Sequence, residues 1–179
     1  MANNNSALNA DLSVLDRFRF IGSVEDDTQP EPQEKDLSGQ LQTLLANVSV
    51  FYHATHEYHW NVTGNDFYQY HKFFDEIVSD VYESIDPIAE NIRKLGKQPV
   101  YNMHDLVDHA TIKPTTVDST ESISYAKELS KLNSSLIEFI KATFDMANKD
   151  NEQGIANFLA ERIDQHQKWQ WFLDSSIGK

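Results

Sequence analysis

The feature that most constrains the fold is an apolar stripe between residues 36 and 62. Its members recur at intervals of three and four residues, which places them on one face of a helix. They are Leu41, Leu44, Leu45, Val48, Phe51, Tyr52 and Thr55. Patterns of the same kind continue to residue 175, and glycine and proline are scarce, with six and five copies. The sequence therefore predicts an all-α chain built from long amphipathic helices.

The second predicted helix runs from about Asp66 to Leu95, and Gly96 ends it as a C-cap. Residues 97–117 are too many for a tight hairpin, so we expect a long crossover. Its segment 103–110 favours a short helix between the second and third long helices.

The starts of the last two helices are predicted from capping residues. The third helix is expected to begin near Asp118 or Ser119, with Glu121 completing a capping box. The fourth is expected to begin at Asp150, with Gln153 three residues later. These boundaries define a four-helix-bundle domain over residues 36–179.

The charge balance limits the classes of partner. The 179 residues carry a net charge of −13, so the chain attracts cations rather than nucleic acid.

There is no run of apolar residues long enough to cross a membrane and no basic-then-apolar secretory signal at the start. Together these features favour the cytoplasm. The absence of cysteine excludes disulfides and thiolate ligands.

Residues 1–35 are expected to form a flexible acidic tail. Three basic residues stand against seven acidic ones, so this tail cannot neutralise DNA phosphates, and DNA binding through it is not expected. Its segment 14–21, VLDRFRFI, is too apolar for a plain linker. Two interpretations are open: it docks on the protein's own surface, which we favour, or it binds a separate partner.

A set of metal-ligating residue types lies between positions 59 and 90. Gly64 separates two histidines, and three acids follow the second one; the set is His59, His71, Asp75, Asp86 and Glu90. The last four fall within an arc of roughly 100° on one helix, a face that we expect to point inward. Buried acids need a metal or a polar partner, and mixed N and O ligands suit iron, zinc or manganese. The alternative is an ordinary solvated face.

The motif resembles the signature of the Dps mini-ferritins (DNA-binding proteins from starved cells). His59-Trp60-Asn61-Val62-x-Gly64-x-x-Phe67 is followed by His71-x-x-Phe74-Asp75 and Asp86-x-x-Ala89-Glu90. The resemblance implies a ferritin-like four-helix bundle assembled as a hollow dodecamer. It also implies a di-iron ferroxidase centre that oxidises ferrous iron, preferably with hydrogen peroxide, and stores ferric mineral. His59, His71 and Asp75 would come from one subunit, and Asp86 and Glu90 from its two-fold-related neighbour.

Several residues near this motif have weaker assignments. Pro87 lies between Asp86 and Glu90 and predicts a kink in the helix. Of the other histidines on the first helix, His56 is expected beside the site and His53 on the surface. Trp60 is interpreted as a large packing residue near the site, with a redox role as the alternative.

Two further sites are possible. The predicted short helix carries His104, Asp105, Asp108 and His109, which we interpret as surface residues rather than a second metal site. His166 is expected in the core or an interface.

In Dps proteins, acids near the turn before the fourth helix line three-fold pores; the corresponding residues are Asp145, Asp150 and Glu152.

Two other functions compete with iron storage. Di-iron oxygenases on this bundle use Glu-x-x-His motifs on two helices, and this sequence contains no such motif. A nucleoid protein that compacts DNA, with no major storage role, is the alternative that we keep. The net negative charge argues against it.

Overall fold

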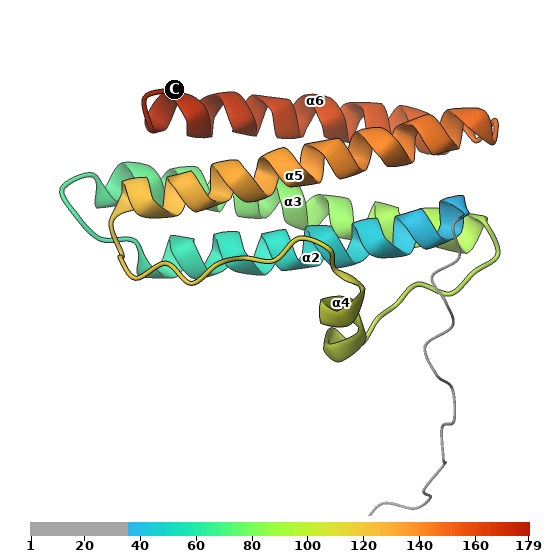
Figure 1. Ribbon diagram of the computed structural model, residues 1–179, viewed down its shortest axis with the longest axis horizontal. Coiled ribbons are helices and arrows are strands. Elements are labelled where there is room, and N and C mark those ends of the chain that lie inside the picture. Colours follow the sequence, from blue (N-terminus) through green and yellow to red (C-terminus); the bar gives the residue numbers. More distant parts are fainter. Residues whose placement is uncertain (1–35) are drawn as a thin grey trace, which may run out of the picture. The chain divides into compact units, whose positions relative to one another are not determined.

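Five helices account for most of residues 36–179, which are the residues that this computed structural model describes (Figure 1). They are α2 (Leu37–Asn61), α3 (Phe67–Lys94), α4 (Met103–His109), α5 (Ser122–Lys149) and α6 (Gln153–Ser176). The predicted acidic tail and its apolar segment 14–21 lie outside the described residues. The fold is the predicted all-α four-helix bundle, with the short helix α4 in the crossover.

The four long helices form two antiparallel hairpins, α2 with α3 and α5 with α6, packed on each other (Figure 1). Helices α3 and α5 run in the same direction, so the chain must return along the bundle between them. A helix of 28 residues such as α3 is about 42 Å long, which explains why the connection needs so many residues.

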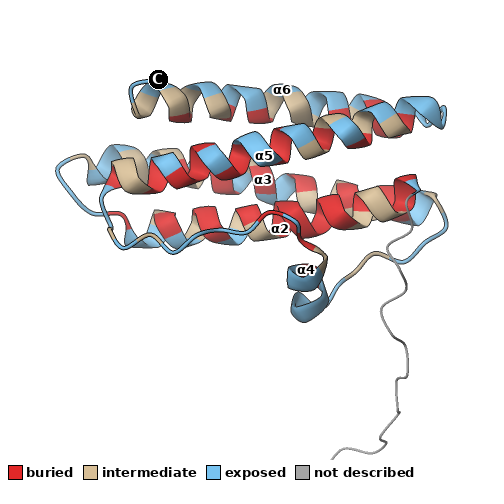
Figure 2. Cartoon of the chain, viewed as in Figure 1, coloured by how far each residue is buried: buried red, intermediate tan, exposed pale blue. Residues whose placement is uncertain are grey.

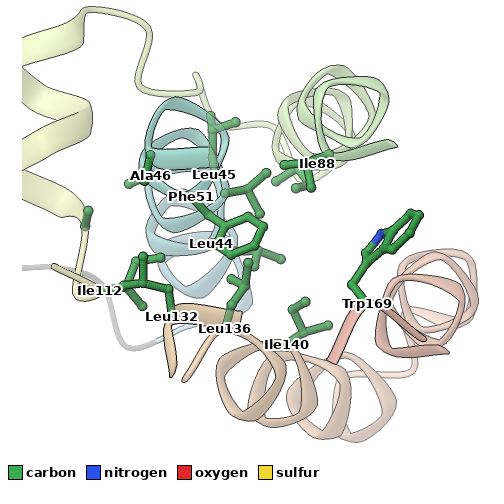
Figure 3. Close-up of a cluster of buried hydrophobic side chains, with 14 of the residues drawn as sticks. Leu44, Leu45, Ala46, Phe51, Ile88, Ile112, Leu132, Leu136, Ile140 and Trp169 are labelled. Carbon is green, nitrogen blue, oxygen red and sulfur yellow. The ribbon is translucent and has the colours of Figure 1, made fainter. Parts of the chain in front are cut away.

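The core lies where the two hairpins face each other, as the buried faces in Figure 2 show. Phe51 and Leu44 from α2, Ile88 from α3 and Leu136 and Ile140 from α5 are almost fully buried there (Figure 3). Each such side chain stabilises the fold by roughly 1.5–3 kcal/mol through removal of apolar surface from water. The stripe predicted on the first helix is buried apart from Tyr52, which is half-buried.

Buried polar side chains attach the crossover to the bundle. Asn47 of α2 is fully buried, and its side-chain oxygen accepts hydrogen bonds from the backbone N–H of Thr111 and of Ile112, at 2.7 and 3.1 Å. Glu128 of α5 accepts one from the N–H of Thr115 at 2.8 Å. These bonds satisfy backbone groups of a segment that has no regular structure of its own.

Helix α5 begins later than the capping pattern predicts. Its first residue is Ser122, and Glu121 makes no side-chain capping bond, so the predicted start at Asp118 or Ser119 is wrong. The preceding residues are held extended instead: the N–H of Thr63 donates to the carbonyl of Thr120 at 2.9 Å, and Thr63 bridges Glu121. This tertiary pairing outweighs the local capping preference.

Helix α6 also begins later than predicted, at Gln153. Asp150 is the C-cap of α5 rather than an N-cap, and its N–H donates to the carbonyl of Met146. Asn151 adopts a φ of 61°, a left-handed conformation that asparagine tolerates and that reverses the chain between the two helices. None of the described helices is long and apolar enough to cross a membrane.

Candidate metal centre

Two histidines face each other where α2 ends and α3 begins. His59 lies in the last turn of α2, and His71 in the second turn of α3. The chain between them turns at Gly64, whose φ of 120° is a conformation that favours glycine. This turn brings the two imidazole rings into a stack, with centroids 3.9 Å apart and planes inclined by 20°.

Each of these histidines is oriented by the backbone of the other. The Nδ1 of His59 lies 2.8 Å from the carbonyl oxygen of His71, and the Nδ1 of His71 lies 2.8 Å from that of His59. A carbonyl only accepts hydrogen bonds, so each Nδ1 must carry the proton. Nε2 of each ring takes no part in this bond, and in the neutral form it keeps the lone pair with which histidines bind metals.

Asp75 lies one turn after His71 on α3 and is half-buried. The ring of His56, on α2, lies 5.8 Å from that of His59. Partial burial and the nearby His59 and His53 lower the pKa of His56, and Asp75 opposes this effect. His56 is thus a neighbour of the site and His53 is exposed, both as predicted.

Asp86 and Glu90 lie farther along α3 and are exposed. We predicted that the face of α3 with these acids points inward, and within one protomer this is wrong. The side of α3 that enters the core carries Ile77, Val81 and Ile88 instead. The acidic residues lie on the outer side because a helix can bury only one stripe in its own bundle. Helix α3 continues through Pro87 without interruption, and the kink predicted there stays a prediction.

One protomer therefore carries only part of the predicted ligand set. Among residues 36–179, no three histidine, aspartate or glutamate side chains come together closely enough to hold a metal ion. The histidine pair and Asp75 lie near one end of α3, whereas Asp86 and Glu90 lie in its second half. About 11 residues separate Asp75 from Asp86, a rise of about 16 Å along the helix.

The comparisons with known proteins agree with this architecture. A family model for the ferritin-like domain matches residues 38–179. The Dps protein from Vibrio cholerae, described as a member of the ferritin-like diiron-carboxylate superfamily, is 31% identical, with a TM-score of 0.75. That match covers 79% of this chain and 88% of the other. The chain belongs to the Dps family of ferritin-like proteins.

Two other relatives support the assignment to the Dps family. The DNA protection during starvation protein of Helicobacter pylori is 27% identical over 138 residues, which are 77% of this chain and 96% of that protein. The Dps structure from Thermosynechococcus elongatus is 28% identical, with a TM-score of 0.75, and the match covers 80% of this chain and 90% of the other.

The Dps protomer exposes large aromatic side chains beside the histidine pair. Trp60 is 66% exposed, so its interpretation as a packing residue of the protomer is wrong. Its indole lies 4.2 Å from the ring of His56, near the end of α2. Tyr82, on the outer side of α3, is 61% exposed. Within residues 36–179, both side chains are therefore mostly open to solvent.

The three predicted pore acids are exposed at the α5–α6 turn. Asp145 lies in the last turns of α5, Asp150 caps that helix, and Glu152 occupies the N-cap position of α6. Asp150 and Glu152 also line a shallow depression of about 190 Å³ together with the start of α2 and the end of α3. Cations in the solvent can therefore reach these carboxylates.

The histidines and acids of α4 form no comparable centre. His104 Nδ1 lies 3.3 Å from a carboxylate oxygen of Asp108 and 3.8 Å from one of Asp105, and all three side chains are largely exposed. His109 directs its Nδ1 to the backbone carbonyl of Asp105. The exposure of His104, Asp105 and Asp108 confirms their predicted surface position.

A buried polar network links α3, α5 and α6, and the sequence pattern did not reveal it. Arg162 donates two hydrogen bonds to the carboxylate of Asp80, at 2.9 and 2.8 Å, and Trp169 donates a third at 2.8 Å. Burial alone would raise the pKa of Asp80, but these bonds from Arg162 and Trp169 outweigh it and lower the pKa. The sequence did offer one indication of this network, which is Trp169 on the apolar side of α6. The N–H of a buried indole usually has a hydrogen-bond acceptor nearby.

His166 also belongs to this network. It lies in the core, as predicted, and its imidazole is neutral. Its Nδ1 lies 2.7 Å from the side-chain oxygen of Asn133, and its Nε2 lies 3.4 Å from Arg162. Burial and the positive charge of Arg162 lower the pKa of His166 to about 3, although Asp80 opposes the effect. His166 is therefore a structural residue and lies outside the predicted metal centre.

Proposed function

We propose that this chain is a subunit of a Dps shell that oxidises ferrous iron, preferably with hydrogen peroxide, and stores the ferric product. The observation that carries the proposal is the histidine pair. His59 and His71 are held in the tautomer that presents Nε2, and a half-buried carboxylate, Asp75, follows His71 by one turn of α3. An imidazole and carboxylate donor set suits iron.

The missing ligands would come from a second copy of the chain. If two α3 helices met antiparallel about a two-fold axis near residue 80 or 81, Asp75 of one copy would lie opposite Asp86 of the other. Asp86 and Glu90, which are exposed in the protomer, would then complete the centre formed by His59, His71 and Asp75 of the neighbour. The same contact would cover the exposed ring of Tyr82.

The chemistry of this centre is electron transfer from bound substrate. Two ferrous ions held close together would each give one electron to one peroxide molecule. Its O–O bond would break, and uptake of two protons would give two water molecules. Delivery of both electrons at one place avoids the release of hydroxyl radical. The imidazoles and the carboxylates would bind the iron, and the negative carboxylates would offset its charge.

The assignment is tested by replacing both His59 and His71 with Ala and following peroxide-driven iron oxidation in the assembled protein. We expect fast oxidation to be lost. The matched control is the double variant H53A/H104A, which removes two exposed histidines outside the proposed centre and should oxidise iron like the wild type. Wild-type rates in H59A/H71A would overturn the proposed centre.

The inter-subunit arrangement has its own test. Native mass measurement should find a dodecamer of the 20.6 kDa subunit, and Asp86→Ala should impair oxidation nearly as much as loss of the histidines. A stable monomer that oxidises iron at full rate would contradict the shared centre.

Storage requires that iron enters the shell, and we assign entry to Asp145, Asp150 and Glu152. Three copies of these acids around an axis would concentrate negative potential in a narrow passage. The alternative function, DNA compaction without a major storage role, gains no support from a chain with a net charge of −13. A cytoplasmic location stays a prediction of the sequence.

A further inference from the structure

The end of the bundle that carries the proposed iron entrance is also the end at which the described chain begins. The start of α2 and the α5–α6 turn lie together there (Figure 1). Asp36, the N-cap of α2, lines the same depression of about 190 Å³ as Asp150 and Glu152. The residues before Asp36 are therefore joined to the bundle beside acids that we assign to iron entry.

Among residues 36–179, the exposed charges at this end of the bundle cancel within one protomer. Acids surround the α5–α6 turn, but the end of α3 and the last turn of α5 are basic. Four residues of each sign are exposed there: Asp36, Arg93, Lys94, Lys97, Asp145, Lys149, Asp150 and Glu152. Charges that sum to zero attract a distant cation weakly, so the described residues alone do not explain how this entrance gathers ferrous ions.

The sequence before Asp36 carries the negative charge that this end lacks. Residues 25–35 contain five acids and one basic residue, and they are Glu25, Asp26, Asp27, Glu31, Glu34 and Lys35. Residues 1–24 contain two acids and two arginines, which cancel. The excess of negative charge in residues 1–35 is therefore confined to the part that adjoins the bundle.

Chain length limits how far these acids can lie from the entrance. A chain spans at most about 3.3–3.6 Å per residue, so the backbone of Glu34 lies within about 7 Å of that of Asp36. The same rule keeps Glu31 within about 18 Å and Glu25 within about 40 Å of Asp36. These limits hold for any conformation of the segment. The charges of Glu31 and Glu34 therefore stay near the entrance.

We propose that residues 25–35 are an electrostatic collector that draws ferrous ions to the entrance at the α5–α6 turn; this inference rests on the proposed ferroxidase function and its entrance. The segment adds an excess of negative charge beside a bundle end whose own charges cancel. Three copies around an axis would add their fields. Such a field raises the local concentration of cations and speeds their arrival by about 10-fold to 10³-fold.

A collector differs from acidity that serves only solubility, because its effect depends on position and on salt. It acts on the arrival of the ion and not on the chemistry at the centre. The Debye length is about 30 Å at an ionic strength of about 0.01 M and about 3 Å at about 1 M. The segment should therefore lower the ferrous concentration that half-saturates oxidation at low salt only, and leave the maximal rate unchanged.

The test compares the wild type with two variants of the segment, all as assembled full-length protein checked by native mass. One variant is E31Q/E34Q, and the other changes all five acids of residues 25–35 to their amides. The matched control is D118N/E121Q, which removes two exposed acids before the start of α5, at the other end of that helix from the entrance. Peroxide-driven oxidation is followed over a range of ferrous concentrations, at ionic strengths of about 0.01 M and about 1 M.

At low salt, we expect the half-saturating ferrous concentration to rise several-fold in the five-amide variant and by a smaller factor in E31Q/E34Q. D118N/E121Q should match the wild type. All four proteins should agree at high salt, and their maximal rates should be equal throughout. An unchanged half-saturating concentration in both segment variants at low salt, or an equal rise in D118N/E121Q, would overturn the collector alone. A wild type that does not oxidise iron would overturn the ferroxidase function itself, and the collector with it.

Discussion

Asp80→Ala should be among the most destabilising single substitutions outside the apolar core. The Asp80 and Arg162 side chains are only 21% and 13% exposed, and their paired hydrogen bonds join α3 to α6. Removal of the carboxylate leaves the guanidinium, within residues 36–179, with the contact to His166 at 3.4 Å. It also leaves the indole N–H of Trp169 without its acceptor, and Arg162 Nε already has no hydrogen-bond partner among residues 36–179.

The magnitude follows from the cost of an unpaired buried charge. Breaking a buried ion pair by removing one partner costs about 3–5 kcal/mol in the free energy of unfolding. For a chain of this size, each kcal/mol lowers the melting temperature by about 2–4 °C, so we expect a decrease of roughly 6–20 °C. Asp80→Asn should fall between the wild type and Asp80→Ala, because the amide oxygen can still accept a hydrogen bond.

The assay is thermal or urea unfolding followed by circular dichroism, at one subunit concentration because subunit association contributes to apparent stability. The matched control is Glu138→Ala, which breaks the exposed ion pair with Lys141 and should cost no more than about 1 kcal/mol. The double variant D80A/R162M should recover much of the loss, because it removes the orphaned charge. If Asp80→Ala unfolds within about 1 kcal/mol of the wild type, the network has no such role.

Two other predictions concern pH and iron entry. Folding lowers the pKa of His166 from 6.5 to about 3. Between these two pH values the unfolded chain binds a proton at His166 and the native chain does not. The free energy of unfolding therefore decreases as the pH falls from 6.5 towards 3. Between pH 6.5 and 5 this is about 2 kcal/mol per subunit, and His166→Gln should flatten that slope in urea unfolding; an unchanged slope would contradict a neutral buried imidazole. D145N/E152Q should slow iron uptake more at low salt than at high salt, because salt already screens the pore field. The control E161Q/D164N removes two other exposed acids, and equal uptake by both variants at low salt would place the entrance elsewhere.

The sequence by itself determined the local structure well. Apolar residues at intervals of three and four defined the long helices to within a residue or two for α2 and α3. Gly96 ends the second of these with a φ of 82°, as a C-cap glycine should. The residue types and spacing from His59 to Glu90 also pointed to the Dps family, which the fold and the relatives then confirmed.

The tertiary structure alone decided which surfaces and partners these residues have. Period and spacing placed Asp86 and Glu90 on one stripe of α3, but only the packing of α3 against the bundle showed that this stripe faces outward. The late start of α5 came from its pairing with Thr63, 57 residues away from Thr120. Local preferences of about 1 kcal/mol, such as a capping box, are readily outweighed by such contacts.

The same limit applies to the polar pairs in the interior. Asp80 and Arg162 are 82 residues apart in the chain, and the sequence pattern around either residue does not predict that they pair. The reciprocal bonds between His59 and His71 likewise depend on the angle at which α2 meets α3. Periodicity reports which face of a helix is apolar, whereas a hydrogen bond between distant residues depends on how whole helices pack, and that is a property of the assembled bundle.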